Sequence, residues 1–573
     1  MAMKKRARPS ARVAVVLSLA LAAAGGAYAL LYEPDRSRPE RVRLVDACDI
    51  EPAYLQRLWR GYTPYRSGDV LLIERYPNGF GKRHASPFPY TQDVPLVLYG
   101  PGFIRPGRYE GEATHADLAP TFAELLGFDA FPERDGRVLD EARFPGTSAM
   151  ARRGSSSRSS GTVPATTRSS AGRRPGLTSR PGCPRPPTSS TPPWARRRPS
   201  RRPRTRRWGT GSWAKVHGLP DALTRVKGRI VDPWEEASPR YLRVKTLADL
   251  YDAALGNEPL VGVLARDGWH LGMIGHGAYL PEGDKDIAVL DTLGHGTAHR
   301  TNSDYYRMPA YFERRTGLTE AVRAVDSRDG SLDGRWLGND FMSVDDAKVR
   351  YTPAWPIYQT GRLIELVRKE GFGADDVPDL LYTNYKSIDL ASHQWTMNDP
   401  EFRDNLAETD RQLPRLLRFL DRYVGRNRYV IALTSDHGVA APPETRAGWP
   451  IFVPEITRDL QARFDRTNPD VGLVLANRGW TITLNHEELT ANGVSAADVA
   501  RFLRSYTVED NLRPGQDMPS VWRGRGREKV FLTALTPEEL RAALSCARGR
   551  MRDAHSAKAL SEDVPGAQPG ARG

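Results

Sequence analysis

Two stretches, "PDLLYTNYKSIDLASH" (residues 378–393) and "RYVIALTSDHG" (residues 428–438), decide the fold. Each begins as an apolar run typical of a buried strand and ends in a loop of Asp, His, Ser and Asn. Between them, residues 403–424 carry apolar side chains at helical spacing. This order of strand, helix and strand predicts a βαβ unit in an α/β protein.

The two polar loops carry the candidate site. Asp389 and His393 stand four residues apart, and Asp436 is followed directly by His437. In open α/β sheets the chemistry lies at the carboxyl ends of the strands, where both loops fall. A carboxylate with an imidazole suits zinc or another first-row divalent ion. A lone Asp/His pair is more often structural, but two such pairs favour two divalent ions, with zinc as the expected metal.

Other stretches fill in the fold. Residues 68–76 and 94–102 are apolar runs closed by turn residues and predict strands, and "THADLAPTFAELLGF" (residues 114–128) predicts a helix. After about residue 450, residues 471–489 contain two strand-like runs, followed by helical patterns at 495–507 and 536–547. The Ala, Gly and Pro-rich tail predicts disorder.

The two polar loops resemble the alkaline phosphatase superfamily, specifically its type I phosphodiesterase and nucleotide pyrophosphatase branch. In that branch "DxxxH" and "DHG" are metal-binding motifs, and here the glycine usual before the first His is Ser392. The resemblance assigns Asp389 and His393 to one ion, and Asp436 and His437 to the other. It implies a mostly parallel sheet with helices on both faces, here with a small C-terminal α+β appendage.

The family also places a late histidine on the first ion. The matching text, "HASPFPYTQDVPLVLYGPG", supplies His84, but it precedes the "DHG" turn instead of following it. The helix-like "HADLAPTFAELLG" resembles the family's closing helix and is displaced in the same way. The resemblance therefore implies a circular permutation, which keeps neighbours in space when the old termini lay close together. An exposed loop histidine is the alternative interpretation of His84.

Two catalytic parts are missing from the expected place. The resemblance requires an Asp after a hydrophobic strand, often in "WDG", and a Thr or Ser nucleophile in a stretch like "SSPSxTPxxHxTLxTG". Both should lie between residues 146 and 218. Residues 151–208 instead hold sixteen arginines and no Lys, Asp or Glu, so that without them the net charge of +14 becomes −2. The positive charge is a local anomaly, whereas a basic binding surface would spread over one face of the fold.

A shifted reading frame accounts for this segment. When the last base of each codon is joined to the first two of the next, Trp194–Ala195 and Trp208–Gly209 must both encode Gly. With the remaining bases free, residues 191–209 can read "ATVGSSPSVTPATHATLG", and residues 154–164 can read "VVVAVVWDGA". We therefore infer a compensated frameshift. In the restored frame the metal Asp is encoded across Gly161 and Thr162.

The nucleophilic Thr of the restored frame is encoded across Ser200 and Arg201, and neither catalytic residue exists in the chain as written. A disordered basic linker is the alternative interpretation of the segment. An RNA-binding tail finds no support, because aromatic residues do not alternate with the basic ones. No nucleic-acid partner is expected.

The N-terminus predicts export. Basic residues precede the apolar run Val13–Tyr32, which is long enough to cross a membrane or to serve as a cleaved signal peptide. Either fate places residues 33–573 outside the cytoplasm, anchored facing outside or secreted. In that compartment Cys48 and Cys546 can pair, or remain two thiols.

The expected function is divalent-metal-dependent hydrolysis of phosphate esters through a phospho-Thr intermediate, with the chain as written inactive. A non-catalytic cell-surface protein that keeps the fold is the alternative. Lys386 is a candidate contact for substrate phosphate or a solvated lysine, and His270 and His276 are expected to pack in the core or a loop. The expected divisions are a signal or anchor (1–32), a permuted part of the phosphatase-like domain (33–148), the anomalous segment (149–208), the main phosphatase-like domain (209–455), the α+β appendage (456–555) and a disordered tail (556–573).

Overall fold

The computed structural model of the 573-residue chain describes residues 15–21, 47–81, 86–146, 206–291, 299–467, 472–547 and 549. His84, most of the arginine-rich segment and the C-terminal tail lie outside these ranges, so the predictions made for them remain untested by the structure.

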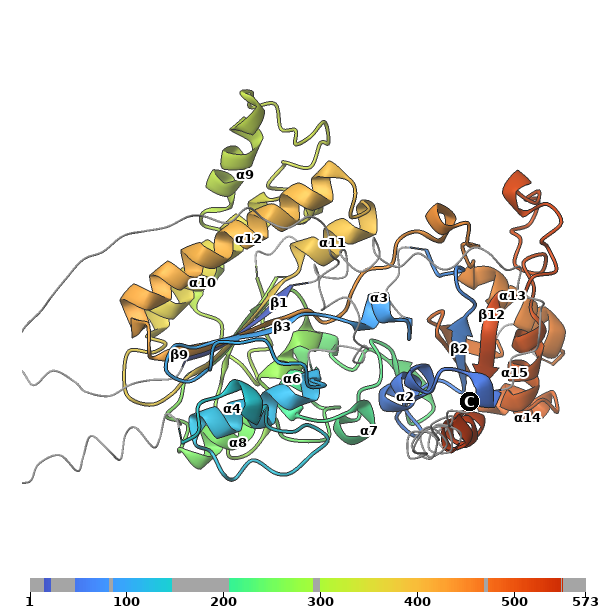
Figure 1. Cartoon of the computed structure of the whole chain (residues 1–573), viewed down its shortest axis with the longest axis horizontal. Coiled ribbons are helices and arrows are strands. Elements are labelled where there is room, and N and C mark those ends of the chain that lie inside the picture. The colour runs from blue at the N-terminus through green and yellow to red at the C-terminus, as the bar shows by residue number, and fades with distance from the viewer. Residues whose placement is uncertain are drawn as a thin grey trace, which may run out of the picture.

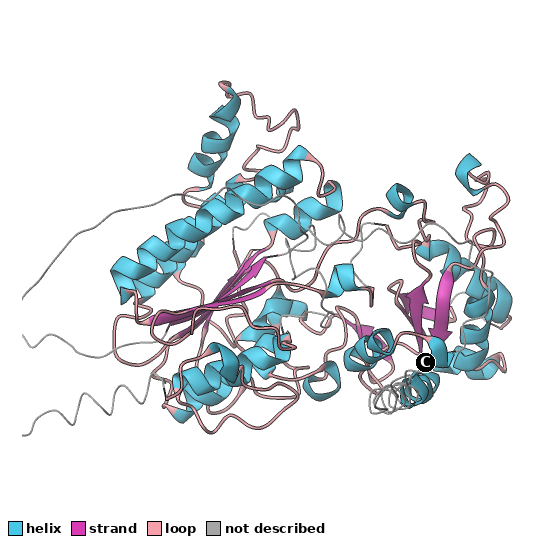
Figure 2. Cartoon of the chain, viewed as in Figure 1, coloured by secondary structure: helices cyan, strands magenta, loops and turns pink. Residues whose placement is uncertain are grey.

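The larger part of the molecule is built on a six-stranded sheet (Figures 1 and 2) with the order β3-β9-β1-β8-β6-β7. All neighbouring strands are parallel except β3, which pairs antiparallel with β9 at one edge. The predicted α/β class and mostly parallel sheet are confirmed. The strands are β1 (Val15–Leu21), β3 (Leu96–Tyr99), β6 (Val261–Ala265), β7 (Ile287–Leu290), β8 (Leu380–Tyr385) and β9 (Tyr429–Thr434).

The predicted βαβ unit runs from β8 to β9, with α11 (Ser387–Gln394) and α12 (Pro400–Leu420) between them. Alternate residues of β8 enter opposite cores: Leu380 and Tyr382 pack on one face of the sheet, and Leu381 and Tyr385 on the other. A strand buried on both faces reads as a continuous apolar run, which is why the sequence predicted it.

Helices cover both faces of this sheet (Figure 1), as the family resemblance implied. One face carries α12 and α10 (Ala354–Glu370), and the other carries α4 (Leu118–Leu126) and α8 (Leu247–Ala254). The short helix α6 (Arg206–Thr210) contacts α4 and places Trp208 in the second of these cores. The remaining elements of this part are α3 (Pro89–Gln92), α7 (Ala214–His217), α9 (Leu318–Asp326), and the ribbon β4 (Thr224–Val226) and β5 (Arg229–Val231).

The central strand β1 comes from an unexpected place. It lies between β8 and β9, with Val16 beside Leu380 on one side and Ala20 beside Thr434 on the other. The sequence predicted a signal peptide or membrane anchor for residues 1–32; the structure describes residues 15–21 as a strand, and the rest of that segment lies outside the described residues. The reason is physical: "VVLSLAL" is as suitable for a central strand as for a membrane helix. Among the described residues, no helix has both the length and the apolar character needed to cross a bilayer.

A second, smaller sheet has the order β10-β11-β2-β12, and all its pairs are antiparallel. Its strand β2 (Val70–Glu74) was expected in the phosphatase-like domain, as part of residues 33–148. The structure corrects that boundary, since β2 and α2 (Pro52–Gly61) pack with the C-terminal part of the chain. The other elements are β10 (Val474–Asn477), β11 (Thr481–Leu484), β12 (Phe531–Leu535), α13 (Val453–Phe464), α14 (His486–Ala491) and α15 (Ala496–Ser505).

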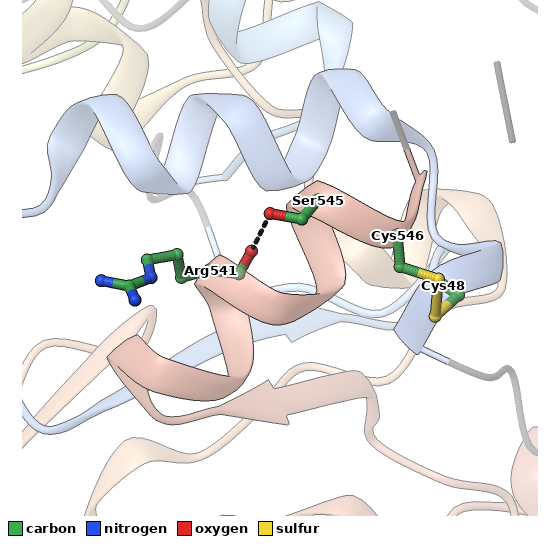
Figure 3. Close-up of a disulfide and its surroundings, with 4 residues drawn as sticks. All are labelled: Cys48, Arg541, Ser545 and Cys546. Carbon is green, nitrogen blue, oxygen red and sulfur yellow. Dashed lines mark hydrogen bonds between the residues drawn. A yellow bond between two sulfur atoms is a disulfide. The ribbon is translucent and has the colours of Figure 1, made fainter. Parts of the chain in front are cut away.

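A disulfide joins two segments of this smaller unit that lie far apart in sequence (Figure 3). Cys48 pairs with Cys546, with the Cα atoms 5.4 Å apart and a sequence separation of 498 positions. The structure thus favours pairing over two free thiols. A disulfide that closes so long a loop removes conformational freedom from the unfolded chain.

Candidate functional site

The candidate site lies at the carboxyl edge of the main sheet, where β8 and β9 end. Lys386 follows β8 directly, and Asp389 occupies the first turn of α11. Asp436 and His437 follow β9 in a loop. Because β8 and β9 are parallel and only β1 separates them, both sets emerge at one edge, as the sequence predicted.

The structure brings these side chains into one cluster instead of two separate pairs. His437 Nε2 lies 3.4 Å from Asp389 Oδ1 and 3.6 Å from Asp436 Oδ2. Lys386 Nζ lies 3.0 Å from Asp389 Oδ2 and 3.6 Å from Asp436 Oδ2. Lys386, Asp389 and His437 are all buried. Lys386 is therefore not the solvated lysine that was one interpretation of it.

His393 lies at the open side of the cluster. It stands one helical turn after Asp389 on α11, so the two side chains share a face of the helix. Its Nε2 atom lies 3.7 Å from Asp389 Oδ2, and its side chain is 37% exposed, against 4% for Asp389. The "DxxxH" spacing thus places one buried side chain, Asp389, and one solvent-accessible side chain, His393, on the same face of α11.

The cluster is charged at neutral pH. Burial alone would raise the pKa of Asp436, but electrostatic interactions with His437 and Lys386 lower it to about 2. Burial alone would lower the pKa of Lys386, but the carboxylates of Asp389 and Asp436 outweigh it and raise that pKa above its ordinary value. Asp436 therefore stays ionised at neutral pH, beside the ammonium of Lys386.

The donor set fits divalent metal ions. Two carboxylates and two imidazoles converge here, and carboxylate and imidazole are ligand types of zinc. The Lys386 ammonium lies against both carboxylates, at a place that attracts a cation. Asp389, His393, Asp436 and His437 are therefore suitable metal ligands by their chemistry.

The chain that follows His84 packs against the "DHG" turn. The Gly438 N–H donates to the Thr91 carbonyl over 3.0 Å, and a Cβ at Gly438 would lie 2.2 Å from the Tyr90 carbonyl oxygen. Only glycine permits this close approach. His84 itself lies outside the described residues, but Tyr90 and Thr91, which follow it in the matching text, contact this turn.

Sequence reasoning missed one histidine near the site. His115 Nε2 lies 3.0 Å from the hydroxyl oxygen of Thr434, the last residue of β9, and its ring is 5.5 Å from that of Trp208. Its position in the "HADLAPTFAELLG" text was the available signal. His276 packs in the core as predicted, against Asp249, and His270 is buried with its ring accepting a hydrogen bond from Trp269.

Comparisons with known proteins agree with these motifs. The sequence profile described as type I phosphodiesterase / nucleotide pyrophosphatase matches residues 208–522. The alkaline phosphatase PafA of Elizabethkingia meningoseptica is 24% identical over 135 residues, which is 23% of this chain and 25% of that protein. A calcium-transporting ATPase of Myroides odoratus is 28% identical over 164 residues, which is 26% of this chain and 30% of that protein.

Alkaline phosphatase PhoV of Synechococcus elongatus is 31% identical over 74 residues, 13% of this chain and 14% of that protein. The chain thus spans less than a third of the length of the curated relatives it matches. The crystal structure of wild-type PafA shares 18% sequence identity and covers 57% of this chain and 73% of that one, with a TM-score of 0.43.

The profile match begins where the arginine-rich segment ends, and it includes Asp389, His393, Asp436 and His437. It covers more than half of the chain, and the protein therefore belongs to the type I phosphodiesterase / nucleotide pyrophosphatase family.

Proposed function

We propose that the restored reading frame encodes an exported, two-metal hydrolase of phosphate esters, and that the chain as written is its inactive form. Asp389, His393 and His84 are assigned to one ion, and Asp436 and His437 to the other, with zinc as the metal. The observation that carries the proposal is the position of β1 between the two strands that deliver these ligands.

The β1 position is where the missing ligand is needed. Leu21 lies beside Tyr385, directly before Lys386, and Ala20 lies beside Thr434, two residues before Asp436. A residue following this strand emerges between the two ligand loops. In the sequence as written Leu21 is followed by an alanine, which offers no ligand. The restored reading "VVVAVVWD" instead supplies seven apolar residues followed by an Asp, which suits a central strand and a metal site together.

The end of the restored nucleophile motif is also in a suitable place. The motif ends in the in-frame Thr210–Gly211, and α6 is helical up to Thr210. A Cβ at Gly209 would lie 2.4 Å from the Met273 carbonyl oxygen, so α6 packs tightly on the loop after β6. The restored Thr lies about ten residues before this anchored end in sequence.

In the proposed reaction the Thr hydroxyl oxygen bonds to phosphorus and gives its proton to solvent, while the P–O bond to the leaving group breaks and that oxygen takes up a proton from solvent to leave as the alcohol. Water then cleaves the phospho-Thr ester and releases the phosphate product. Bound divalent ions supply a lowered pKa for the nucleophile and neutralise charge on the phosphoryl oxygens. The residues of this chain hold those ions in place, and Lys386 balances the charge of Asp389 and Asp436.

The proposed location is outside the cytoplasm. The Cys48–Cys546 disulfide supports this, because structural disulfides persist in oxidising compartments. In the restored protein the encoded strand fills the central position, which leaves Val13–Tyr32 free to act as a signal peptide or anchor.

The test compares the written and restored proteins, purified with Zn²⁺, on bis(p-nitrophenyl) phosphate and p-nitrophenyl phosphate. We expect hydrolysis by the restored protein at least about 10³-fold faster than by the written one, since the nucleophile is regained. A restored protein that binds zinc and cleaves neither ester would support the alternative, a non-catalytic protein with this fold. A restored protein that binds no metal would overturn the proposal.

A further inference from the structure

A small cavity adjoins the candidate site, among the carboxyl ends of β6, β7 and β8. Its volume is about 20 Å³, and its polar walls include Arg266 after β6, Asp291 after β7, and Asn384 and Lys386 at the end of β8. Side chains of α10 form another wall. Because Lys386 lines this cavity and also contacts the metal-ligand carboxylates, the two sites are neighbours.

Asn384 brings an unused hydrogen-bonding group to the cavity. The residue is 3% exposed, and its Oδ1 atom is buried and accepts no hydrogen bond from any described residue. Since no described residue holds this side chain, the amide can rotate to present either its oxygen or its NH₂ group. The buried Nε–H of Arg266 likewise donates to no described residue. Buried polar groups of this kind normally have partners, which indicates a ligand between them.

The wall formed by Asp291 carries an excess of positive charge. Arg315 Nη2 donates to Asp291 Oδ1 over 2.9 Å, and Arg350 Nε lies 3.2 Å from Asp291 Oδ2. Two guanidinium groups thus share one carboxylate, which leaves one positive charge in excess. Asp291 is 6% exposed and Arg350 is 4% exposed, so water compensates little of this charge. A buried excess of positive charge favours a bound anion.

Two pKa shifts are consistent with this excess. Burial lowers the pKa of Arg350 to about 10, and Arg266 and Arg315 add to the shift although Asp291 opposes it. Burial also lowers the pKa of His299, which lines the cavity, to about 3, and nearby arginines act in the same direction. His299 is therefore uncharged at neutral pH, because its surroundings disfavour a further positive charge.

We propose that this cavity binds one halide ion, chloride under physiological conditions, between Arg266 and Asn384. A water molecule needs about 10–15 Å³, so the cavity admits one ligand little larger than water. A phosphate group, with four oxygens around phosphorus, does not fit, which distinguishes this ion from the substrate of the neighbouring site. Water can hydrogen-bond to the same groups, but only an anion compensates the excess charge. The proposal does not depend on the proposed hydrolase activity.

The experiment is thermal unfolding of the full chain as written, freed of metal by chelation, in sodium chloride, bromide or gluconate at equal ionic strength. Gluconate is too large for the cavity and serves as the reference. We expect chloride and bromide to raise the unfolding midpoint by at least about 2 °C over gluconate, because a ligand that binds only the folded state stabilises it. Asn384→Leu removes a hydrogen-bonding partner of the ion and Arg350→Met removes the excess charge, so both variants should lose this rise.

Two controls separate ion loss from misfolding and from general salt effects. In gluconate, Asn384→Leu should unfold no lower than the unmodified protein, because an apolar side chain of similar size replaces an amide that has no protein partner. Lys369→Met, at an exposed lysine paired with Glu365, should keep the halide-induced rise.

Bromide scattering distinguishes a halide from water. In crystals soaked in bromide, anomalous scattering should show the ion between Arg266 and Asn384, whereas a water molecule in that place would overturn the proposal. It is overturned equally if chloride gives no rise over gluconate, or if both Asn384→Leu and Arg350→Met keep the rise.

Discussion

The strands β8 and β9 differ from β1, the strand between them, in the residues at their carboxyl ends. Both outer strands run directly into ligands, Asp389 after β8 and Asp436 after β9. The strand β1 comes from residues 15–21 and is followed in sequence by alanines. Many apolar runs of suitable length can complete a buried parallel sheet, but the ligand at the strand's end must be encoded directly after it. The sheet can therefore form with another apolar segment in its central position, but a metal site cannot form there without the Asp that follows the encoded strand.

Deleting residues 1–32 should have the largest effect. In the chain as written this removes β1, which hydrogen-bonds to both β8 and β9, and splits the central sheet. The loss should exceed the whole stability of the fold, about 5–15 kcal/mol, and abolish cooperative unfolding. Circular dichroism during heating and limited proteolysis measure this.

The same deletion in the restored protein should leave the unfolding midpoint unchanged, because the encoded strand replaces β1. If the chain as written folds normally without residues 1–32, residues 15–21 do not take the place of the missing central strand.

The next largest effect is expected from a substitution at the carboxyl end of β8, which should reduce activity and bound zinc. Asp389→Asn in the restored protein should lower hydrolysis by at least about 10³-fold and reduce bound zinc, because Asp389 contacts Lys386, His393 and His437 at the centre of the cluster. Metal analysis and ester hydrolysis are the readouts.

The matched control is Asp379→Asn, which alters a buried carboxylate one residue before β8 starts, at the other end of the strand. It should retain zinc and activity. Equal losses in the two variants would show that Asp389 acts only through stability.

Lys386→Met tests the charge balance of the site. Without its ammonium, Asp389 and Asp436 keep two negative charges in a buried site, and the free energy of unfolding in chelator should fall by about 3 kcal/mol. Added Zn²⁺ should then raise the unfolding midpoint more than in the unmodified protein, since the metal replaces the lost cation.

The control for this variant is Lys369→Met, a half-exposed lysine of α10 paired with Glu365, which should change stability by less than about 0.5 kcal/mol. A smaller zinc response in Lys386→Met than in the unmodified protein would argue against competition between the lysine and the metal.

The smallest effect is a pH dependence from Asp379. Burial raises the pKa of this carboxyl to about 7, although the N–H groups of Gly373 and Leu260 oppose the rise by donating to it. The folded state thus binds a proton more tightly than the unfolded state. The contribution of this bound proton to the free energy of unfolding is fully present below the ordinary pKa of 3.8 and is lost as pH rises through about 7.

Urea unfolding at pH 5 and pH 8 measures this contribution. The free energy of unfolding should fall between these pH values by on the order of 2 kcal/mol more in the unmodified protein than in Asp379→Asn. Identical pH dependence in the two proteins would mean that Asp379 is already ionised at pH 5.

The candidate site was predictable where strand and ligand are contiguous in sequence. The apolar runs that became β8 and β9 lead straight into Asp389 and Asp436, so local pattern and the carboxyl-edge rule were sufficient. The burial of Lys386 was not predictable, because it depends on a partner fifty residues away, Asp436. The contact of His115 with Thr434 depends likewise on the packing of a distant segment.

The fold was predictable for element type but less so for the sheet to which a strand belongs. The run that became β2 was correctly predicted as a buried strand, but its assignment to the small sheet depends on pairing with β11 and β12, more than 400 residues later. The segment that contains β1 was predicted as a signal peptide or membrane anchor, because a long apolar run suits such a segment as well as a buried strand.

The most direct test of the frameshift is peptide mass spectrometry of the protein made by its native organism, over the region between residues 150 and 212. We expect peptides that contain "VGSSPSVTPATHATLGTG", which carry the nucleophile. Peptides that match the arginine-rich text would contradict the frameshift, because the catalytic strand and nucleophile would then be absent from the natural protein.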